Sequence, residues 1–392
     1  MENLIVHATA DELARYRAVT GEKSSIFRSL RSLYLALRRA RRYTSAVQKA
    51  YGVGPAAQLR ELAKARLGVG LSTEQFYLHQ YYLPERREIW RRHVDASGHL
   101  QGWLIADCGR RYSEILHDKI AFFQMAENIG LPTIPIIATF VEGRAISTAA
   151  ALAGDLFSKP STGWKGNHGE LWRYEAGLYR HSKKALAFQW RELLEHLRKQ
   201  SELQGRAFIL QAAARNHQGL APLTNGALAT VRIVTCKAPS GSIDLMPPAL
   251  KIPWGEAVAD NMAQGGVVAP IDLASGRLSG PGYRKDCKVG SVRVLNHPNT
   301  GAVLTNFELP FWRETVQLAR RAHAEFDSLF FIGWDIAILE GGPVILEGNP
   351  YWDPDVICLS HRVPLADTQF VSYWLRAYNP MALNPIHSAL SN

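Results

Sequence analysis

The sequence predicts a mixed α+β protein in which two lobes follow a basic helical N-terminal region. Three observations predict this class. Helix-like and strand-like segments alternate from residue 113 onward, whereas the first hundred residues show helical periodicity alone. A chain of 392 residues also exceeds one compact core of ordinary size. We therefore expect three regions, at residues 1–110, 111–205 and 206–380.

The first region carries most of the net positive charge. Residues 1–100 contain 17 Lys and Arg against 9 Asp and Glu, so 17 − 9 = +8 of the total of +10 lies there. Apolar residues within 26–48 follow the spacing of one helical face, and arginines lie mostly elsewhere around it. Such a helix binds an anionic membrane surface or another polyanion, such as tRNA, or it packs with a solvated basic face.

More helix is predicted over residues 56–67 and 73–94, with three tyrosines packed between these segments. The tyrosines are Tyr77, Tyr81 and Tyr82. The second region begins with a helix over 113–130, which Gly130 closes, and continues with a strand over 131–143. A further helix is expected over 185–199.

The third region begins with two strands and an amphipathic helix, predicted at residues 207–213, 230–238 and 310–326. Two more strands, at 334–339 and 343–349, flank Glu340-Gly341-Gly342. This spacing is a strong hairpin signal.

The composition is that of an ordinary globular protein, 47% hydrophobic and 20% charged. The four cysteines form no CxxC pair, so neither a zinc knuckle nor a disulfide framework is indicated, and a cytoplasmic location is expected. The beginning of the chain lacks the apolar segment of a signal peptide. The longest apolar run, at 129–141, is interrupted by Gly130, Pro132 and Pro135, so no transmembrane segment is predicted.

The predicted hairpin carries three oxygen-bearing side chains, Asp335, Glu347 and Asn349. Glu347 and Asn349 share one face because strand side chains alternate. Carboxylate and amide oxygens that converge in this way suit Mg²⁺, which takes one or two carboxylates together with water and phosphate oxygens. The alternative is a hairpin whose acids only cap its turn.

A glycine-rich loop at residues 161–169 follows a short apolar run that contains Lys159. Glycines let backbone N–H groups approach phosphate oxygens closely, and a nearby lysine offsets their charge. Lys165 is followed by Gly166 and not by Ser or Thr, so this is not a Walker loop. An ordinary surface loop has the same composition.

Arg232 is the third candidate for a binding role. It lies on an otherwise apolar strand, where a guanidinium needs an anionic partner. Its planar fork fits a phosphate or a carboxylate. The partner is therefore either a ligand or a structural acid.

Taken together, these segments resemble the ATP-grasp superfamily, in particular the sugar-transfer-associated ATP-grasp group. The resemblance runs from about residue 70 to residue 370. It rests on the order and spacing of HDKIAFFQMAENIGLPTIP, FSKPSTGWKGNHG, LATVRIVT, DNMAQGGVVAPID, LNHPNTG, ELPFWRETVQLA and GWDIAILEGGPVILEGNP. It implies an ATP-grasp fold in which a first lobe with the loop and a second lobe with the hairpin clasp ATP.

The resemblance also implies roles for individual residues. Lys119 and Lys159 would contact the nucleotide phosphates, and Gln211 would lie in the hinge beside the adenine. Arg232 would hold the γ-phosphate and is therefore counted as catalytic. The hairpin acids and amide would bind Mg²⁺ ions that bridge the phosphates. The loop positions expected to bind ATP are Ser161, Thr162, Gly163 and Gly166.

Two features depart from the family pattern. The hinge commonly supplies a carboxylate for the ribose, yet this chain has Asn216 and His217 there. Many ATP-grasp enzymes also begin with a Rossmann-like lobe, whereas this chain begins with basic helices. The substrate site is therefore expected to differ from those of the better-known ligases.

The activity implied by the resemblance is the ATP-dependent joining of a carboxylate to an amine through an acyl phosphate, with release of ADP and phosphate. The substrates would be small molecules such as an amino acid, a peptide or a carboxylated sugar. Lys251, Arg284 and Lys285 are candidates for holding the carboxylate, and His168 or His217 for taking the amine proton. Two alternatives share the nucleotide residues: a small-molecule kinase, and a peptide ligase that uses aminoacyl-tRNA.

Overall fold

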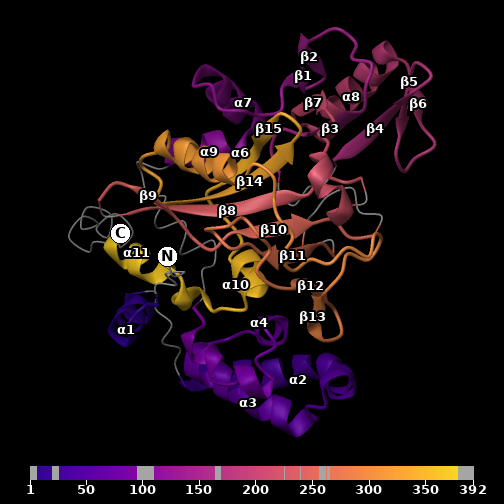
Figure 1. Ribbon diagram of the computed structural model, residues 1–392. Coiled ribbons are helices and arrows are strands. Elements are labelled where there is room, and N and C mark those ends of the chain that lie inside the picture. The colour runs from indigo at the N-terminus through magenta and orange to yellow at the C-terminus, as the bar shows by residue number, and fades with distance from the viewer. Residues whose placement is uncertain are drawn as a thin grey trace.

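The computed structural model describes residues 7–19, 26–94, 110–163, 169–224, 226–238, 240–255, 262 and 265–377. Figure 1 shows a helical region at the bottom, a large sheet with helices on both faces in the middle, and a second sheet at the top. Helices and antiparallel sheets are mixed throughout. The predicted α+β class is therefore confirmed.

Helices form the described part of the N-terminal region, as predicted for 26–48 and 56–67. Their bounds are α1 (Ala10–Val19), α2 (Ile26–Tyr51), α3 (Pro55–Val69), α4 (Thr73–Leu78), η1 (Pro84–Arg86) and η2 (Ile89–Arg92). α2 packs along α3, and Ala36, Ala40 and Val47 turn inward to a shared apolar core. Arginines occur along α2, and no described helix is both long enough and apolar enough to cross a bilayer.

The continuous helix predicted over residues 73–94 is wrong. α4 ends at Leu78, Gln80 adopts a positive φ of 53°, and Pro84 begins a 3₁₀ helix. A left-handed residue turns the chain out of the helical path, and a proline cannot donate the next backbone hydrogen bond. The tyrosines expected to pack in this segment are buried: Tyr77, Tyr81 and Tyr82.

The smaller sheet has the strand order β2-β1-β7-β3-β4-β5-β6, with every neighbouring pair antiparallel. The bounds are β1 (Ile136–Val141), β2 (Arg144–Thr148), β3 (Leu156–Pro160), β4 (Glu170–Glu175), β5 (Leu178–His181), β6 (Ala187–Phe188) and β7 (Phe208–Ala212). α8 (Trp190–Gln204) packs on this sheet through Leu193 and Leu197. β7 lies just beyond the boundary predicted at 205/206, yet it is a central strand of this sheet.

The larger sheet has the order β13-β12-β11-β10-β8-β14-β15, and β9 also pairs with β8. The bounds are β8 (Thr230–Lys237), β9 (Ile243–Leu245), β10 (Ala249–Ile252), β11 (Val267–Pro270), β12 (Gly282–Asp286), β13 (Gly290–Val294), β14 (Phe331–Leu339) and β15 (Gly342–Asn349). β14 and β15 pair directly across residues 340–341, so the predicted hairpin is confirmed.

Helices cover both faces of the larger sheet (Figure 1). The remaining described helices are η3 (Gln218–Leu223), α9 (Trp312–Ala324), α10 (Asp355–His361), η5 (Leu365–Asp367) and α11 (Phe370–Ala377). Val231 and Ile233 of β8 join the apolar core beneath α9. Because strand side chains alternate, Arg232 lies on the opposite face, where α10 packs.

The single helix predicted over 113–130 is instead two helices, α6 (Arg110–His117) and α7 (Lys119–Asn128). Asp118 separates them because its backbone is extended and its carboxylate accepts a hydrogen bond from the Ile120 N–H at 2.9 Å. Leu116 and Phe122 pack into the core of the larger sheet. Both helices therefore lie against the sheet that carries the hairpin.

The N-terminal helices are fixed to the larger sheet along β13. Ser291 Oγ donates to the Leu78 carbonyl at 2.6 Å, and Gln80 Nε2 donates to the Ser291 carbonyl at 3.0 Å. Gly290 has a positive φ of 89°, and a Cβ there would lie 2.2 Å from the Tyr77 backbone. A glycine is required for this close approach.

Candidate functional site

Strand register aligns three charged residues across the larger sheet. Arg232 on β8 is paired with Asp335 on β14, and Asp335 is paired with Glu347 on β15. Residues in register share one face of a sheet. Segments more than 100 positions apart in the sequence thus form a single polar row.

Asp335 is the centre of a buried charge network. Arg232 donates through Nε and Nη2 to its two oxygens at 2.8 and 3.0 Å, and Lys251 Nζ lies 3.2 Å from Oδ1. Asp335 is 4% exposed and Arg232 is 7% exposed. Burial alone would raise the pKa of Asp335, but Arg232 and Lys251 outweigh it and hold that pKa below its ordinary value.

Two lysines outside the larger sheet line the same cavity as this row. Lys159 lies on β3, and Lys119 is the first residue of α7, with its Nζ 3.4 Å from the carbonyl oxygens of Ser161 and Gly163. Desolvation and then repulsion from Lys119 lower the pKa of Lys159 to about 8. An anion bound beside Lys159 would stabilise its charged form.

The glycine-rich loop begins beside these lysines. The Ser161 carbonyl accepts a hydrogen bond from the Lys119 N–H at 3.0 Å, and the Ser161 side chain is buried. Thr162 and Gly163 line the space between the lobes. Gly166 lies outside the described residues.

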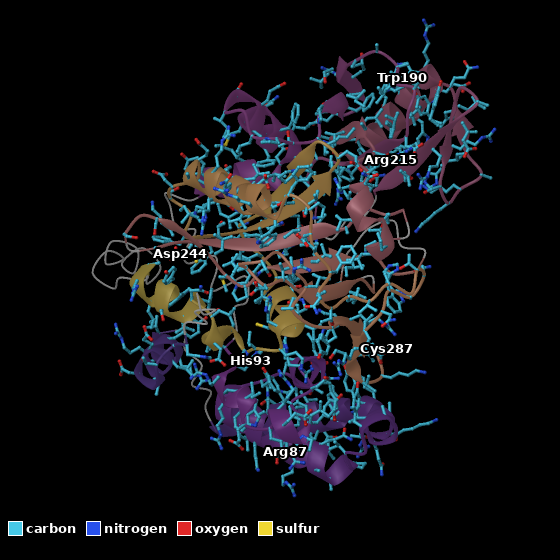
Figure 2. The ribbon with its side chains drawn as sticks, viewed as in Figure 1. Arg87, His93, Trp190, Arg215, Asp244 and Cys287 are labelled. Carbon is cyan, nitrogen blue, oxygen red and sulfur yellow. The ribbon has the colours of Figure 1, made fainter. Side chains whose placement is uncertain are left out.

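A cavity of about 410 Å³ lies between the lobes. Its lining includes the predicted residues Lys119, Lys159, Thr162, Gly163, Gln211, Arg232, Lys251, Asp335, Glu347 and Asn349. Gln211 Nε2 donates to the Ile134 carbonyl at 2.7 Å, which fixes its side chain. The hinge residues 212–215 follow along the wall, and Figure 2 shows Arg215 where the lobes meet.

The hairpin offers a donor set that fits Mg²⁺. Among the described residues, no group hydrogen-bonds the buried Asn349 Nδ2, so this amide is not fixed by the protein and its Oδ1 is the atom that can ligate a metal at the cavity wall. Asp335 and Glu347 add carboxylate oxygens to this amide. In the described part of the chain, no group of three His, Cys, Asp or Glu forms a complete metal cage. Water and phosphate oxygens would therefore complete the coordination.

Other predicted residues are not brought to this cavity. Arg284 stacks on Trp254 with its guanidinium 5.0 Å from the ring centre, because alternation along β12 turns it away from the cavity. Asn216 bonds backbone groups of its own loop at 2.7 and 2.9 Å, and His217 lies 3.5 Å from Glu340. His168 lies outside the described residues.

The cavity wall also contains a carboxylate that the sequence patterns did not identify, Asp353. It lies between β15 and α10, and its Oδ1 accepts a hydrogen bond from the Asp355 N–H at 3.0 Å. The preceding residue, Trp352, is buried against Gly333, where a Cβ would come within 2.5 Å of it. In the sequence alone, an Asp that follows a strand and precedes a Pro is typical of a turn, so it does not stand out as a site residue.

Asp355 connects this wall to the N-terminal helices. Its carboxylate lies 3.3 Å from His79 Nε2, 3.3 Å from Gln75 Nε2 and 3.4 Å from Lys285 Nζ. Burial would raise the pKa of Asp355, but the His79 hydrogen bond and the Lys285 charge together lower it. Lys285 itself lines the cavity.

Residues 108–360, well over half of the chain, match the family model described as sugar-transfer associated ATP-grasp. The sequence has no match among curated proteins.

The chain is similar to several solved structures, including the following three. The first, N5-carboxyaminoimidazole ribonucleotide synthetase with ADP, is 11% identical and has a TM-score of 0.36. The matched region covers 62% of this chain and 46% of the synthetase chain. D-Alanine–D-alanine ligase from Helicobacter pylori is 11% identical with a TM-score of 0.38, covering 68% and 62%. D-Cycloserine synthetase is 14% identical with a TM-score of 0.34, covering 71% and 79%. The chain thus spans about half the length of the first of these proteins.

Proposed function

Because the chain belongs to the sugar-transfer-associated ATP-grasp family, we propose that it is an ATP-dependent ligase that joins a carboxylate to an amine. The supporting observation is the polar row of Arg232, Asp335 and Glu347, which shares one cavity with Lys119 and Lys159. One wall offers cations for a polyphosphate, and the other offers carboxylates for a metal.

In this proposal the first lobe binds the nucleotide. Lys119 and Lys159 offset the phosphate charge, and the backbone around Thr162 and Gly163 approaches the phosphates. The hinge that follows Gln211 presents backbone groups to the adenine. The depressed pKa of Lys159 supports this role, because an anion beside it restores the charged form.

Asp335, Glu347 and Asn349 would hold Mg²⁺, which when bound offsets negative charge between phosphate oxygens. Arg232 and Lys251 already neutralise Asp335 in the protein. Their charges then serve two purposes, because they keep this carboxylate ionised and leave cationic groups beside the phosphate.

The proposed reaction has two steps. A substrate carboxylate, held near Lys251, attacks the γ-phosphate beside Arg232, and the bond between that phosphorus and ADP breaks. An amine then attacks the acyl carbon, so a C–N bond forms while the bond to phosphate breaks, and the proton lost from the amine nitrogen leaves with the phosphate. The products are an amide, ADP and phosphate, and closure of the cavity protects the acyl phosphate from water.

The metal assignment is tested by two substitutions that preserve size, Asp335→Asn and Glu347→Gln. Each removes one carboxylate charge, so Mg²⁺-dependent ATP turnover should fall by roughly 100-fold or more. Asp327→Asn, at an exposed position away from the cavity, serves as the matched control. Normal turnover in both cavity variants would refute the assignment.

The ligase is distinguished from a kinase by its dependence on an amine. Pairs of carboxylates and amines, including amino acids, peptides and carboxylated sugars, are incubated with ATP and Mg²⁺ and the products are weighed by mass spectrometry. A condensation product whose formation consumes ATP supports the ligase. Phosphate transfer to a hydroxyl without any amine would replace it with a kinase.

A further inference from the structure

Asp353 and Lys285 form a part of the cavity wall to which the proposed function assigns neither the nucleotide nor the metal. Both residues line the cavity, and Asp353 lies within electrostatic range of Arg232 and of Lys285. This wall therefore adjoins the place where the acyl phosphate would form. Its occupant should be the second substrate of the ligase.

Asp353 presents a carboxylate with unused hydrogen-bonding capacity. Among the described residues, its one hydrogen bond comes from the Asp355 N–H to Oδ1 at 3.0 Å, and no Lys or Arg lies within ion-pair distance. A carboxylate has about four acceptor positions in total. Desolvation, followed by repulsion from Asp355, raises the pKa of Asp353, so a cation beside it would be stabilising.

Lys285 places a positive charge at the same wall. Its Nζ lies 3.4 Å from Asp355, which His79 and Gln75 hold from the other side. The lysine is therefore held in position by a network that includes α4 of the N-terminal region. An ammonium group and a lone carboxylate that share one wall are complementary to a small zwitterion.

We propose that Asp353 and Lys285 form the subsite for the amine substrate and that this substrate is an α-amino acid. Asp353 accepts hydrogen bonds from the substrate ammonium group, and Lys285 binds its carboxylate. This inference rests on the proposed ligase function and assigns its second substrate. A simple amine would bring no carboxylate to the Lys285 ammonium group, and that same ammonium group would repel a second metal ion.

The proposal gives the N-terminal helices a part in substrate binding. Gln75 of α4 and His79, which directly follows that helix, contact Asp355, and Asp355 contacts both Asp353 and Lys285. The helical region thus supports the substrate subsite from behind.

The test uses the full chain with Mg²⁺ and a non-hydrolysable ATP analogue. The twenty amino acids are screened by thermal shift. Each is compared with the corresponding amine, which has the same side chain but no α-carboxylate. The amino acid with the largest effect is then titrated by calorimetry into the wild type, Asp353→Asn, Asp353→Ser and Lys285→Met. The matched controls are Asp327→Asn and Lys288→Met, the latter at an exposed lysine of the same β12–β13 hairpin.

We expect the dissociation constant of the amino acid to rise roughly tenfold or more in each cavity variant, because one charge-assisted hydrogen bond is lost. Both controls should match the wild type, and all variants should bind the nucleotide analogue with unchanged affinity. The parent amine should bind the wild type about as weakly as the amino acid binds Lys285→Met.

Contrary results separate the two proposals. If the nucleotide analogue binds but no amino acid does, the subsite is wrong and the ligase proposal stands. If Asp353→Asn changes the Mg²⁺ requirement and leaves amino acid affinity intact, Asp353 is a metal ligand. If the analogue itself does not bind, the proposed function fails and the subsite fails with it.

Discussion

At the scale of single residues, Arg232 contacts a structural acid that is also a candidate metal ligand. Both Asp335 oxygens accept its hydrogen bonds, and both residues are buried. Removing Arg232 leaves a buried Asp335 charge that, among the described residues, Lys251 alone then offsets. The role of Arg232 in stability can therefore be separated from its role in turnover.

We predict that Arg232→Met lowers the free energy of unfolding by about 3 kcal/mol and abolishes ATP turnover. The double variant Arg232→Met/Asp335→Asn should recover part of that stability, because the stranded Asp335 charge is gone although Lys251 loses Asp335 as a partner, but it should recover no turnover. Urea denaturation and an ADP-release assay measure the two effects. Full turnover in the single variant would move the γ-phosphate role to another residue.

Lys159 predicts a pH dependence of nucleotide binding. Its pKa in the free protein is about 8, below the ordinary lysine value, and a bound phosphate would raise it. Binding above pH 8 therefore takes up a proton, so ATP affinity should fall by up to about tenfold per pH unit there. Calorimetric titration between pH 7 and pH 9.5 measures the slope.

The matched control for this effect is Lys159→Arg, which stays charged throughout that range. Its ATP affinity should be flat above pH 8 even if it is weaker overall. An equal slope in wild type and Lys159→Arg would show that another group carries the titration.

At the scale of elements, α2 keeps the basic surface that its sequence predicts. Residues 31–69 contain nine Lys and Arg and one acid. Arg31, Arg38 and Arg41 are exposed along the outer face, beside Tyr34 at 64% and Leu35 at 39% exposure. Arginines interspersed with exposed apolar side chains fit an anionic membrane surface better than a fully polar solvated face.

We predict that Arg38→Ala/Arg41→Ala weakens binding to phosphatidylserine vesicles by roughly 30-fold, since each basic residue near such a surface contributes about 1 kcal/mol. Vesicle sedimentation at several salt concentrations measures this, and tRNA binding is followed in parallel. Arg144→Ala/Arg191→Ala, at exposed positions of the smaller sheet and α8, is the control. A protein that binds neither polyanion has only a solvated basic face on α2.

At the scale of the whole molecule, a buried histidine links the larger sheet to α9. His323 is 0% exposed, with Nδ1 2.6 Å from Thr235 Oγ1 and Nε2 2.8 Å from the Leu329 carbonyl. A carbonyl only accepts, so Nε2 donates and Nδ1 accepts from the hydroxyl. Burial lowers the pKa of His323 to about 4.

This histidine predicts a loss of stability in mild acid. The unfolded chain takes up a proton below about pH 6.5, whereas the folded chain does so only near pH 4. Neutral His323 therefore adds its full share to the free energy of unfolding above pH 6.5. That share, on the order of 3 kcal/mol, is lost as the pH falls toward 4. Urea denaturation at pH 7 and pH 4.5 measures it.

His323→Gln provides the comparison, because the amide does not titrate. The free energy of unfolding of this variant should lie below that of the wild type at pH 7. Most of the part of that difference that depends on pH, on the order of 3 kcal/mol, should disappear at pH 4.5. A constant difference between the two proteins would show that His323 does not titrate over this range.

Much of the architecture follows from local sequence patterns. The β14–β15 hairpin is determined by a two-residue turn between apolar strands, and α2, α3 and α9 by helical periodicity. The order of the motifs was sufficient to indicate the family. Local signals of this kind depend on residues a few positions apart, which the sequence displays directly.

Tertiary structure decided the composition of the site. Arg284 and Lys285 are equivalent candidates in the sequence, yet strand alternation brings only Lys285 to the cavity. The partner of Arg232 is 103 positions away, and Asp353 is a turn residue until folding brings it within electrostatic range of Arg232. The sequence by itself determined most of the elements and the family, whereas packing decided which charges meet, because burial and pairing depend on contacts between distant segments.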